Sequence, residues 1–185
     1  FEVVRSRFDR EVLYVPPAGP GSTELLVKLY HHRGGLAPVR ARFAVTGGLH
    51  DWRICHRLAA AGVAVPKPVG GAIWPTGSMR PQSSVFAQHW IQGATPLSKV
   101  IRSKETSGQV SEAWVVELCV AIGRFVATIQ RRGYFPRDLH PGNLLYEASP
   151  SGGFNLLLID YESTRRRHPL RKSVAHLNLG HICSY

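Results

Sequence analysis

An aspartate, Asp138, precedes an asparagine, Asn143, by five positions, and a second aspartate, Asp160, ends the apolar run of residues 157–159. Phosphoryl transfer requires mostly positioning and charge neutralisation, and a loop and strand with this spacing converge on a metal-bound triphosphate. Asp138 would accept or orient the proton of the attacking hydroxyl, while Asn143 and Asp160 would ligate the metal. The pattern therefore predicts a phosphotransfer site and restricts the chain to folds that bring this loop and strand together.

Each part of the pattern taken alone has a simpler interpretation. Residues 141–143 have the composition of an ordinary turn, and Asp160 is also typical of a residue that follows a buried strand. The context favours phosphotransfer, because a strongly patterned helix precedes the loop and an apolar β-type run follows it.

That helix is the clearest element in the chain. Ser111 is predicted to cap it, Val110 to contact Val115 as a hydrophobic staple, and residues 131–133 to end it. Its apolar residues recur at helical spacing along one stripe: Trp114, Leu118, Ile122, Phe125 and Ile129. We expect a core helix that supports the catalytic loop.

Upstream, residues 12–15 and 24–30 are predicted to form a hairpin around a turn rich in proline and glycine. On the second strand, Lys28 shares a face with Leu26 and Tyr30. A lone cation among apolar neighbours is a candidate for binding nucleotide phosphates. The alternative is a lysine whose stem covers apolar surface at a sheet edge.

A helix is predicted over residues 46–61, with Thr46 as its cap and Gly62 in the left-handed conformation that ends it. Asp51 lies on this helix and is a candidate ion-pair partner for Lys28. A solvated helix carboxylate is an equally good interpretation of Asp51.

Beyond that helix, residues 63–69 are expected to be extended, because residues before prolines avoid the helical region. Residues 85–90 form a second apolar strand, and residues 91–96 resemble a hinge between lobes. We therefore expect an N-lobe at residues 1–92 and a C-lobe at residues 93–185, together forming one domain.

The composition restricts the class of protein further. A net charge of +11 over 185 residues implies an anionic partner, and without a ribonucleoprotein motif, zinc finger or basic zipper, nucleic acid is not expected. Three widely separated cysteines, Cys55, Cys119 and Cys183, argue against disulfide and zinc frameworks and favour a reducing cytosol. The most apolar window, residues 113–129, contains Glu117 and Arg124, so no membrane span is predicted.

The first residue is Phe1 rather than methionine, and the last residues have a helix-like pattern, so we expect a fragment trimmed at both ends. The oligomeric state is left open by the sequence.

Several segments together resemble the lipopolysaccharide core kinases, and within them the bacterial kinases of Kdo (3-deoxy-D-manno-octulosonic acid). They are residues 27–36, 51–53 and 58–69, together with the loops that carry Asp138, Asn143 and Asp160. The Arg-Gly-Gly-Leu and Gly-Val-Ala-Val-Pro-Lys-Pro segments distinguish this group from eukaryotic-type kinases. The resemblance covers most of the chain.

The resemblance implies an α+β, protein-kinase-like fold with a small β-rich N-lobe containing one helix and a mainly helical C-lobe. It implies ATP and Mg²⁺ as cofactors, and transfer of the γ-phosphate to the 4-hydroxyl of Kdo on a lipid-linked lipid A precursor. Lys28 and Asp51 would bind the nucleotide, Asp138 would be the catalytic base, and Asn143 and Asp160 would hold the metal. The protein would be peripheral on the cytoplasmic face of the bacterial inner membrane.

The chain departs from the family pattern in three places. Asp51 stands where relatives usually have glutamate, so the ion pair with Lys28 is either lost or requires a closer helix. Tyr161 and Glu162 follow Asp160 in place of Phe-Gly or Phe-Asp, and Glu162 is a further candidate metal ligand or a source of repulsion. A nucleotide-covering glycine-rich loop is not visible, so the covering segment is expected near residues 1–9 or is missing.

Two other functions remain open at this point. One is a heptose or other small-sugar kinase of the same superfamily. The other is a pseudokinase, a protein that binds nucleotide or anionic lipid without turnover. Asp51, Glu162 and the lack of a visible covering loop favour it, and the intact Lys28, Asp138, Asn143 and Asp160 oppose it.

Five cations occur among the eight residues 165–172. A solvated basic segment and a contact with an anionic membrane surface explain this run equally well.

Overall fold

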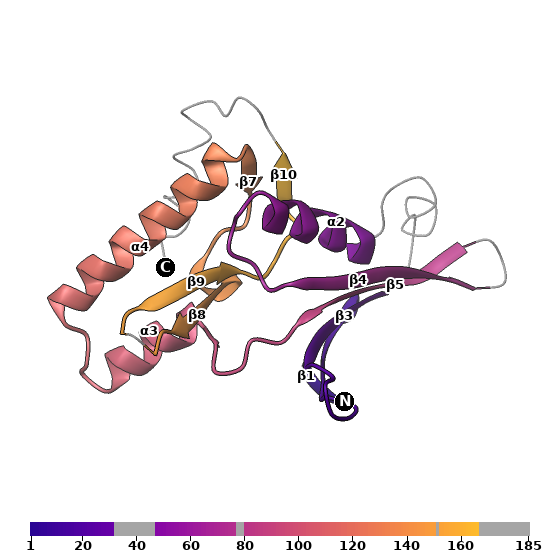
Figure 1. Cartoon of the computed structure of the whole chain (residues 1–185), viewed down its shortest axis with the longest axis horizontal. Helices are drawn as coiled ribbons and strands as arrows, with labels where there is room; N and C mark the ends of the chain where they lie inside the picture. The colour runs from indigo at the N-terminus through magenta and orange to yellow at the C-terminus, as the bar shows by residue number, and fades with distance from the viewer. Residues whose placement is uncertain (32–46, 77–79, 151, 167–185) are drawn as a thin grey trace. The chain divides into compact units, whose positions relative to one another are not determined.

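The structure is a computed structural model, which describes residues 1–31, 47–76, 80–150 and 152–166 (Figure 1). The predicted cap at Thr46, the Arg-Gly-Gly-Leu segment, Cys183 and the basic residues after Arg166 lie outside these ranges. The chain divides into two compact units. The first contains Phe1–Arg57 and Pro66–Ile91, and the second contains Leu58–Val65 and the residues from Gln92 onward.

The first unit is built on an antiparallel five-stranded sheet with the strand order β1-β2-β3-β5-β4. Its strands are β1 (Glu2–Ser6), β2 (Arg10–Val15), β3 (Leu25–His31), β4 (Pro68–Thr76) and β5 (Arg80–His89). The hairpin predicted from residues 12–15 and 24–30 is confirmed as β2 and β3, which pair from Arg10 opposite Tyr30 to Val15 opposite Leu25. Gly21, at a φ of 81°, lies in the turn between them.

The alternation predicted for β3 is confirmed. Lys28 and Tyr30 are buried on one face, and the intervening Leu29 is only partly buried. The same face continues onto β5, where Lys28 is opposite Phe86 and Tyr30 is opposite Ser84, and both β5 residues are fully buried. The face that carries Lys28 is therefore the covered face of the sheet.

Helix α2 (Gly47–Ala60) covers this face and lies alongside β4 and β5 in Figure 1. Gly62 follows it at a φ of 75°, as predicted for the residue that ends the helix. Cys55 is fully buried, and its thiol donates a hydrogen bond to the Pro66 carbonyl at 3.4 Å. This bond connects the helix to the extended segment that leads into β4.

The second unit contains two α-helices among its described residues, α3 (Leu97–Thr106) and α4 (Glu112–Arg131). The prediction for α4 is confirmed at its start, where the Ser111 hydroxyl accepts a hydrogen bond from the Trp114 amide at 3.2 Å. Leu118, Ile122, Val126 and Ile129 are its buried residues. Leu118, Ile122 and Ile129 of the predicted stripe are thus confirmed as core residues. Trp114 and Phe125 are only partly buried, and the buried Val126 was not part of the prediction.

The strands of the second unit surround the predicted loop. They form the sheets β6-β8-β9 and β10-β7, with β6 (Thr95–Pro96), β7 (Tyr134–Pro136), β8 (Leu144–Ala148), β9 (Phe154–Leu158) and β10 (Thr164–Arg166). A short 3-10 helix, η1 (Pro141–Asn143), leads directly into β8. The segment with Asp138 and Asn143 therefore connects β7 to β8, and Asp160 follows β9.

Several elements were not predicted from the sequence, and strand β4 and helix α3 are two of them. Strand β4 contains Pro68, Gly70 and Gly71, residue types that are depleted in strands, but it lies at the edge of the sheet, where they are tolerated. Helix α3 buries only Leu97 and begins after Pro96, which makes no side-chain cap hydrogen bond. Both elements lack the local signals on which sequence interpretation depends.

Candidate active site

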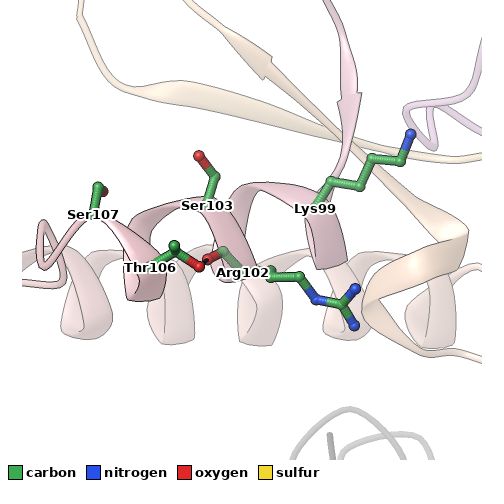
Figure 2. Close-up of a pocket in the computed structure, with 5 residues that line it drawn as sticks. All are labelled: Lys99, Arg102, Ser103, Thr106 and Ser107. Atoms are coloured by element: carbon green, nitrogen blue, oxygen red, sulfur yellow. Dashed lines mark hydrogen bonds between the residues drawn. The ribbon is translucent and has the colours of Figure 1, made fainter.

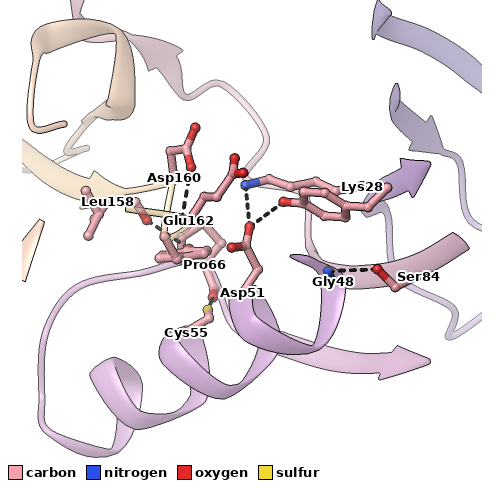
Figure 3. A network of polar contacts seen from close by, with 11 residues as sticks. Lys28, Gly48, Asp51, Cys55, Pro66, Ser84, Leu158, Asp160 and Glu162 are labelled. Atoms are coloured by element: carbon pink, nitrogen blue, oxygen red, sulfur yellow. Dashed lines mark hydrogen bonds and ion pairs between the residues drawn. The ribbon is translucent and has the colours of Figure 1, made fainter. Parts of the chain in front are cut away.

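In the first unit, the predicted ion pair between Lys28 and Asp51 is formed. Lys28 Nζ lies 3.3 Å from Asp51 Oδ2, and the two side chains are 6% and 0% exposed (Figure 3). The interpretation of Asp51 as a solvated helix carboxylate is therefore wrong. Removing two charges from water is costly unless they compensate one another, so each charge here requires the other.

Tyr30 is a third member of this cluster. Its hydroxyl donates a hydrogen bond of 2.6 Å to the same Asp51 oxygen that pairs with Lys28. Burial raises the pKa of Tyr30, and the negative charge of Asp51 raises it further. Tyr30 is thereby held as a neutral phenol that donates to the carboxylate. Among the described residues, Asp51 Oδ1 has no hydrogen-bond partner.

In the second unit, Asn143 connects the parts of the predicted phosphotransfer site. Its side-chain Nδ2 donates to the Asp138 carbonyl at 2.8 Å, and its backbone carbonyl accepts from the Ile159 amide at 3.1 Å. The first bond fixes the loop around Asp138, and the second holds the residue before Asp160 against the loop. The structure therefore brings Asp138, Asn143 and Asp160 together.

The orientation of the Asn143 amide follows from its partner. Because a carbonyl only accepts hydrogen bonds, the amide must present its nitrogen to Asp138. The carbonyl oxygen Oδ1 is then the atom directed elsewhere, and it is an oxygen ligand of the kind that Mg²⁺ prefers. The residue itself is buried, with 9% of its surface exposed.

Two residues beside Asp138 were not identified from the sequence. His140 Nδ1 accepts a hydrogen bond from the Gly142 amide at 3.0 Å, so the proton of a neutral ring is on Nε2, which lies 3.8 Å from Asp138 Oδ2. The Ser163 hydroxyl accepts from the Asp138 amide at 3.1 Å. Ser163 is distant in sequence and gives no signal, whereas His140 lies within the loop and its spacing from Asp138 is a signal that could have been used.

Asp160 lies in a turn that its own side chain stabilises. Its Oδ1 accepts a hydrogen bond from the Glu162 amide at 3.2 Å, shown by a dashed line in Figure 3. Tyr161 is fully buried and donates its hydroxyl to the Leu158 carbonyl at 2.9 Å, so it packs in the interior beside Asp160. Glu162 is exposed, and its role as a ligand stays a prediction.

The N-terminal residues form a hairpin where a covering segment was expected. Strands β1 and β2 are joined by Arg7, Phe8 and Asp9, and the Arg7 amide donates to the Arg10 carbonyl at 2.8 Å. Gly19 lies in the turn before β3, where its carbonyl accepts from the Ser22 amide, as predicted. The role of residues 1–9 toward a nucleotide stays a prediction.

A hollow of about 490 Å³ lies along α3 (Figure 2). Its lining residues are Lys99, Arg102, Ser103, Thr106 and Ser107, all from this helix and its end. None of the residues predicted to act in phosphotransfer lines it, so the hollow is separate from the predicted site.

Two further observations concern metals and membranes. Among the described residues, no three side chains of the His, Cys, Asp and Glu types form a cluster that could hold a metal ion. The described helices include none with the length and hydrophobicity needed to cross a bilayer.

The fold is that of the protein kinases. A solved structure described as WaaP in complex with acyl carrier protein matches 98% of this chain and 69% of its own, with a TM-score of 0.69 and 19% identity. The BubR1 kinase domain matches 93% of this chain and 48% of its own, with a TM-score of 0.62 and 13% identity. At these identities the likeness shows the fold alone, and it confirms the predicted kinase-like α+β class.

The family is shown by the sequence. Residues 25–182 match the lipopolysaccharide kinase (Kdo/WaaP) family, so the chain belongs to that family. Its members are phosphotransferases with an alcohol group as acceptor, which confirms the predicted class of enzyme and implies the use of ATP. No curated protein sequence matches the chain.

The Tyr30 geometry predicts how stability depends on pH. At about pH 8, Tyr30→Phe should unfold more easily than the wild type by about 1–3 kcal/mol, because buried Asp51 loses a donor. The raised pKa means that the contribution of Tyr30 is present below pH 10.0, its ordinary pKa, and is lost as the pH rises above it.

Denaturant unfolding from about pH 8 to 11 tests this. The difference in free energy of unfolding between the wild type and Tyr30→Phe should decrease above pH 10, by at most about 1.4 kcal/mol per pH unit. The reason is that only the wild type has the Tyr30 phenol, which ionises more readily in the unfolded state than in the folded state. A difference that stays constant over this range would contradict the assignment.

Proposed function

We propose that the protein is an ATP-dependent kinase of lipopolysaccharide core biosynthesis that transfers the γ-phosphate to the 4-hydroxyl of Kdo on a lipid A precursor. The observation that carries the proposal is the pair of Asn143 hydrogen bonds that join the loop of Asp138 to the segment of Asp160. Family membership supports the reaction class. The choice of Kdo and of its 4-hydroxyl rests on the sequence resemblance.

In this proposal Asp138 is the catalytic base. Its side chain is 67% exposed, so an acceptor hydroxyl can reach it. The Asn143 and Ser163 hydrogen bonds fix the backbone of Asp138 on both its carbonyl and its amide side. The His140 ring lies next to the carboxylate, with Nε2 3.8 Å from Asp138 Oδ2, a distance too long for a hydrogen bond. The two hydrogen bonds would hold the carboxylate in place to accept the proton of the sugar hydroxyl.

Asn143 and Asp160 fit a magnesium site by the chemistry of their donor atoms. Mg²⁺ is usually bound by one or two carboxylates together with substrate phosphates, and an amide oxygen is a ligand of the same hard type. When bound, the ion would neutralise charge on the triphosphate. Asp160 would contribute a full charge, and the Asn143 oxygen Oδ1 would contribute a neutral ligand.

Lys28 would bind the nucleotide phosphates, with Asp51 and Tyr30 holding its side chain in place. A lysine is a point charge on a flexible stem, so its position depends on the groups that surround it. The Asp51 carboxylate compensates the lysine charge before nucleotide arrives. The ammonium group of Lys28 is almost fully buried next to that carboxylate.

The test of the function is magnesium-dependent ATP turnover with three acceptor conditions: a Kdo-bearing lipid A precursor, a heptose-bearing acceptor, and none. The proposal predicts phosphorylated product with the Kdo acceptor only. Turnover with the heptose acceptor alone would indicate the small-sugar alternative. ATP binding without turnover on either acceptor would indicate a pseudokinase.

Asp138→Asn should lower kcat by roughly 10² to 10⁴ while ATP affinity persists, because the amide keeps the loop's shape but cannot accept the proton. Single-turnover kinetics and ATP-binding calorimetry separate the two effects. Glu105→Gln, which removes an exposed carboxylate on α3, is the matched control and should leave both unchanged. Near wild-type turnover by Asp138→Asn would remove this residue from the mechanism.

Asp160→Asn and Asn143→Ala should both raise the magnesium concentration needed for half-maximal activity, with the larger effect for Asp160, which carries a charge. Activity is measured across a magnesium titration. Asn155→Ala, at an exposed position on β9, serves as the control. If both site variants keep the wild-type dependence, the ion binds elsewhere, and Glu162 is the first residue to examine.

The proposed acceptor also predicts a membrane contact through the basic residues that begin with Arg165 and Arg166, which are exposed on β10. Each cation near an anionic surface contributes about 1 kcal/mol, and the attraction decays within a Debye length. The protein should therefore sediment with phosphatidylglycerol-containing vesicles at low salt and be released at high salt.

Replacing Arg165, Arg166 and Arg167 with serine should weaken vesicle binding and turnover on lipid-linked acceptor, and spare turnover on a short soluble Kdo acceptor. The control removes the same charge elsewhere, by replacing the exposed Arg53, Arg57 and Arg102. Equal loss on both acceptors would place these arginines in the catalytic site or the fold. Vesicle binding that is insensitive to salt would contradict the electrostatic account.

A further inference from the structure

We propose that Gly48 and Gly71 are positioning residues of the nucleotide site, because they let α2 approach the sheet closely enough for the short side chain of Asp51 to reach Lys28. The inference rests on the proposed function in one respect, namely that Lys28 binds nucleotide. It explains how the chain forms this buried ion pair with a carboxylate side chain as short as that of aspartate.

The side-chain length sets the requirement. Aspartate is shorter than glutamate by one carbon–carbon bond, about 1.5 Å. With the ion pair intact at 3.3 Å, that length must be recovered by a smaller distance between the helix backbone and strand β3. An ordinary side chain between helix and sheet would prevent such an approach.

Gly48 is the first place where the approach is visible. A Cβ atom added to Gly48 would lie 2.7 Å from the carbonyl carbon and oxygen of Val85 and 2.8 Å from its amide nitrogen. These neighbours are backbone atoms, which cannot rotate away. The Gly48 amide also donates to the Ser84 hydroxyl at 3.0 Å, and Ser84 is fully buried (Figure 3). The start of α2 is thus bonded directly to β5.

Gly71 provides the same clearance from the sheet side. A Cβ atom at Gly71 would lie 3.0 Å from Trp52 Cβ and 3.3 Å from Leu49 Cδ2, both on α2. Gly71 pairs with Phe86, which in turn pairs with Lys28, so it lies in the same cross-strand row as the lysine. The lack of a side chain at Gly71 therefore lets α2 pack closely on strand β4, next to the ion pair.

Backbone conformation does not explain these two glycines. Neither is among the glycines with positive φ, so an alanine could adopt the same backbone angles. Inside a helix, where Gly48 lies, alanine is ordinarily more favourable than glycine. At both positions the lack of a side chain matters, because a Cβ atom would increase the distance between α2 and the sheet.

The test compares Gly48→Ala, Asp51→Glu and the double variant. Gly48→Ala should move α2 outward, and Asp51→Glu should overfill the site, so each should weaken ATP affinity, measured by calorimetry, by about 10- to 100-fold. In the double variant the longer glutamate side chain spans the larger distance between α2 and Lys28. We therefore expect the double variant to bind ATP about ten-fold more tightly than either single variant. A merely structural role for Gly48 predicts no such recovery.

Lys28→Met provides the readout of the ion pair. Lys28→Met should weaken ATP binding when it is introduced into the wild type or into the double variant. In Gly48→Ala, where the ion pair is already broken, it should weaken ATP binding little further. Gly71→Ala should also move α2 away from the sheet, because its added Cβ contacts Trp52 and Leu49 of the helix. It replaces Gly48→Ala in the test if that variant does not fold. Gly123→Ala on α4, where an added Cβ meets no atom within 4 Å, is the matched control and should raise the Tm.

The inference is overturned if Asp51→Glu alone binds ATP as the wild type does, or if the double variant is no better than Gly48→Ala. It is distinguishable from failure of the proposed function. If the wild type binds no ATP, the proposed function fails, and the Tm values of the same variants still decide the inference: Gly48→Ala and Asp51→Glu must then compensate one another in the double variant.

Discussion

Asn143 provides the interaction on which the second unit depends. Its side chain bonds the carbonyl of Asp138, its amide bonds the carbonyl of His140, and its carbonyl bonds the amide of Ile159. One residue thus joins the loop after β7 to the strand that leads to Asp160. An apolar substitute would keep the two backbone bonds but would remove the side-chain partner of the Asp138 carbonyl, at a cost of about 0.5–1.5 kcal/mol. The chemistry and the local fold therefore impose the same requirement on this position.

The first unit is organised around a different constraint, which is the buried charge of Lys28. Removing one partner of a buried ion pair costs about 3–5 kcal/mol, so the fold must bring a carboxylate to the lysine. In our inference Asp51 meets this need because α2 packs closely on the sheet at Gly48 and Gly71, and Tyr30 adds a neutral donor to the same oxygen. Small residues at Gly48, Gly71 and Ser84 are the structural condition for that contact.

The sequence predicted those features whose residues lie close together along the chain. Asp138, Asn143 and helix α4 were predictable, because their signals lie within a few turns of chain. Contacts that connect distant segments were not, and the hydrogen bond from Asp138 to Ser163 and the clearance between Gly71 and Trp52 are examples. For Asp51 the sequence left two possibilities open, a lost ion pair with Lys28 or a closer helix, and the structure shows the pair formed. The packing of α2 on the sheet was needed to identify Gly48 and Gly71 as the residues that allow the helix to come close.

The most direct test of the central claim, that Asn143 and Asp160 hold the metal on ATP, is paramagnetic broadening by Mn²⁺. Side-chain amide signals of ¹⁵N-labelled protein are followed as Mn²⁺ is added in the presence of ATP, with Asn143→Ala used for assignment. The account predicts that the Asn143 signal disappears at a Mn²⁺ concentration that leaves Asn155, exposed on β9, visible. An Asn143 signal that persists while ATP and Mn²⁺ are bound would contradict it.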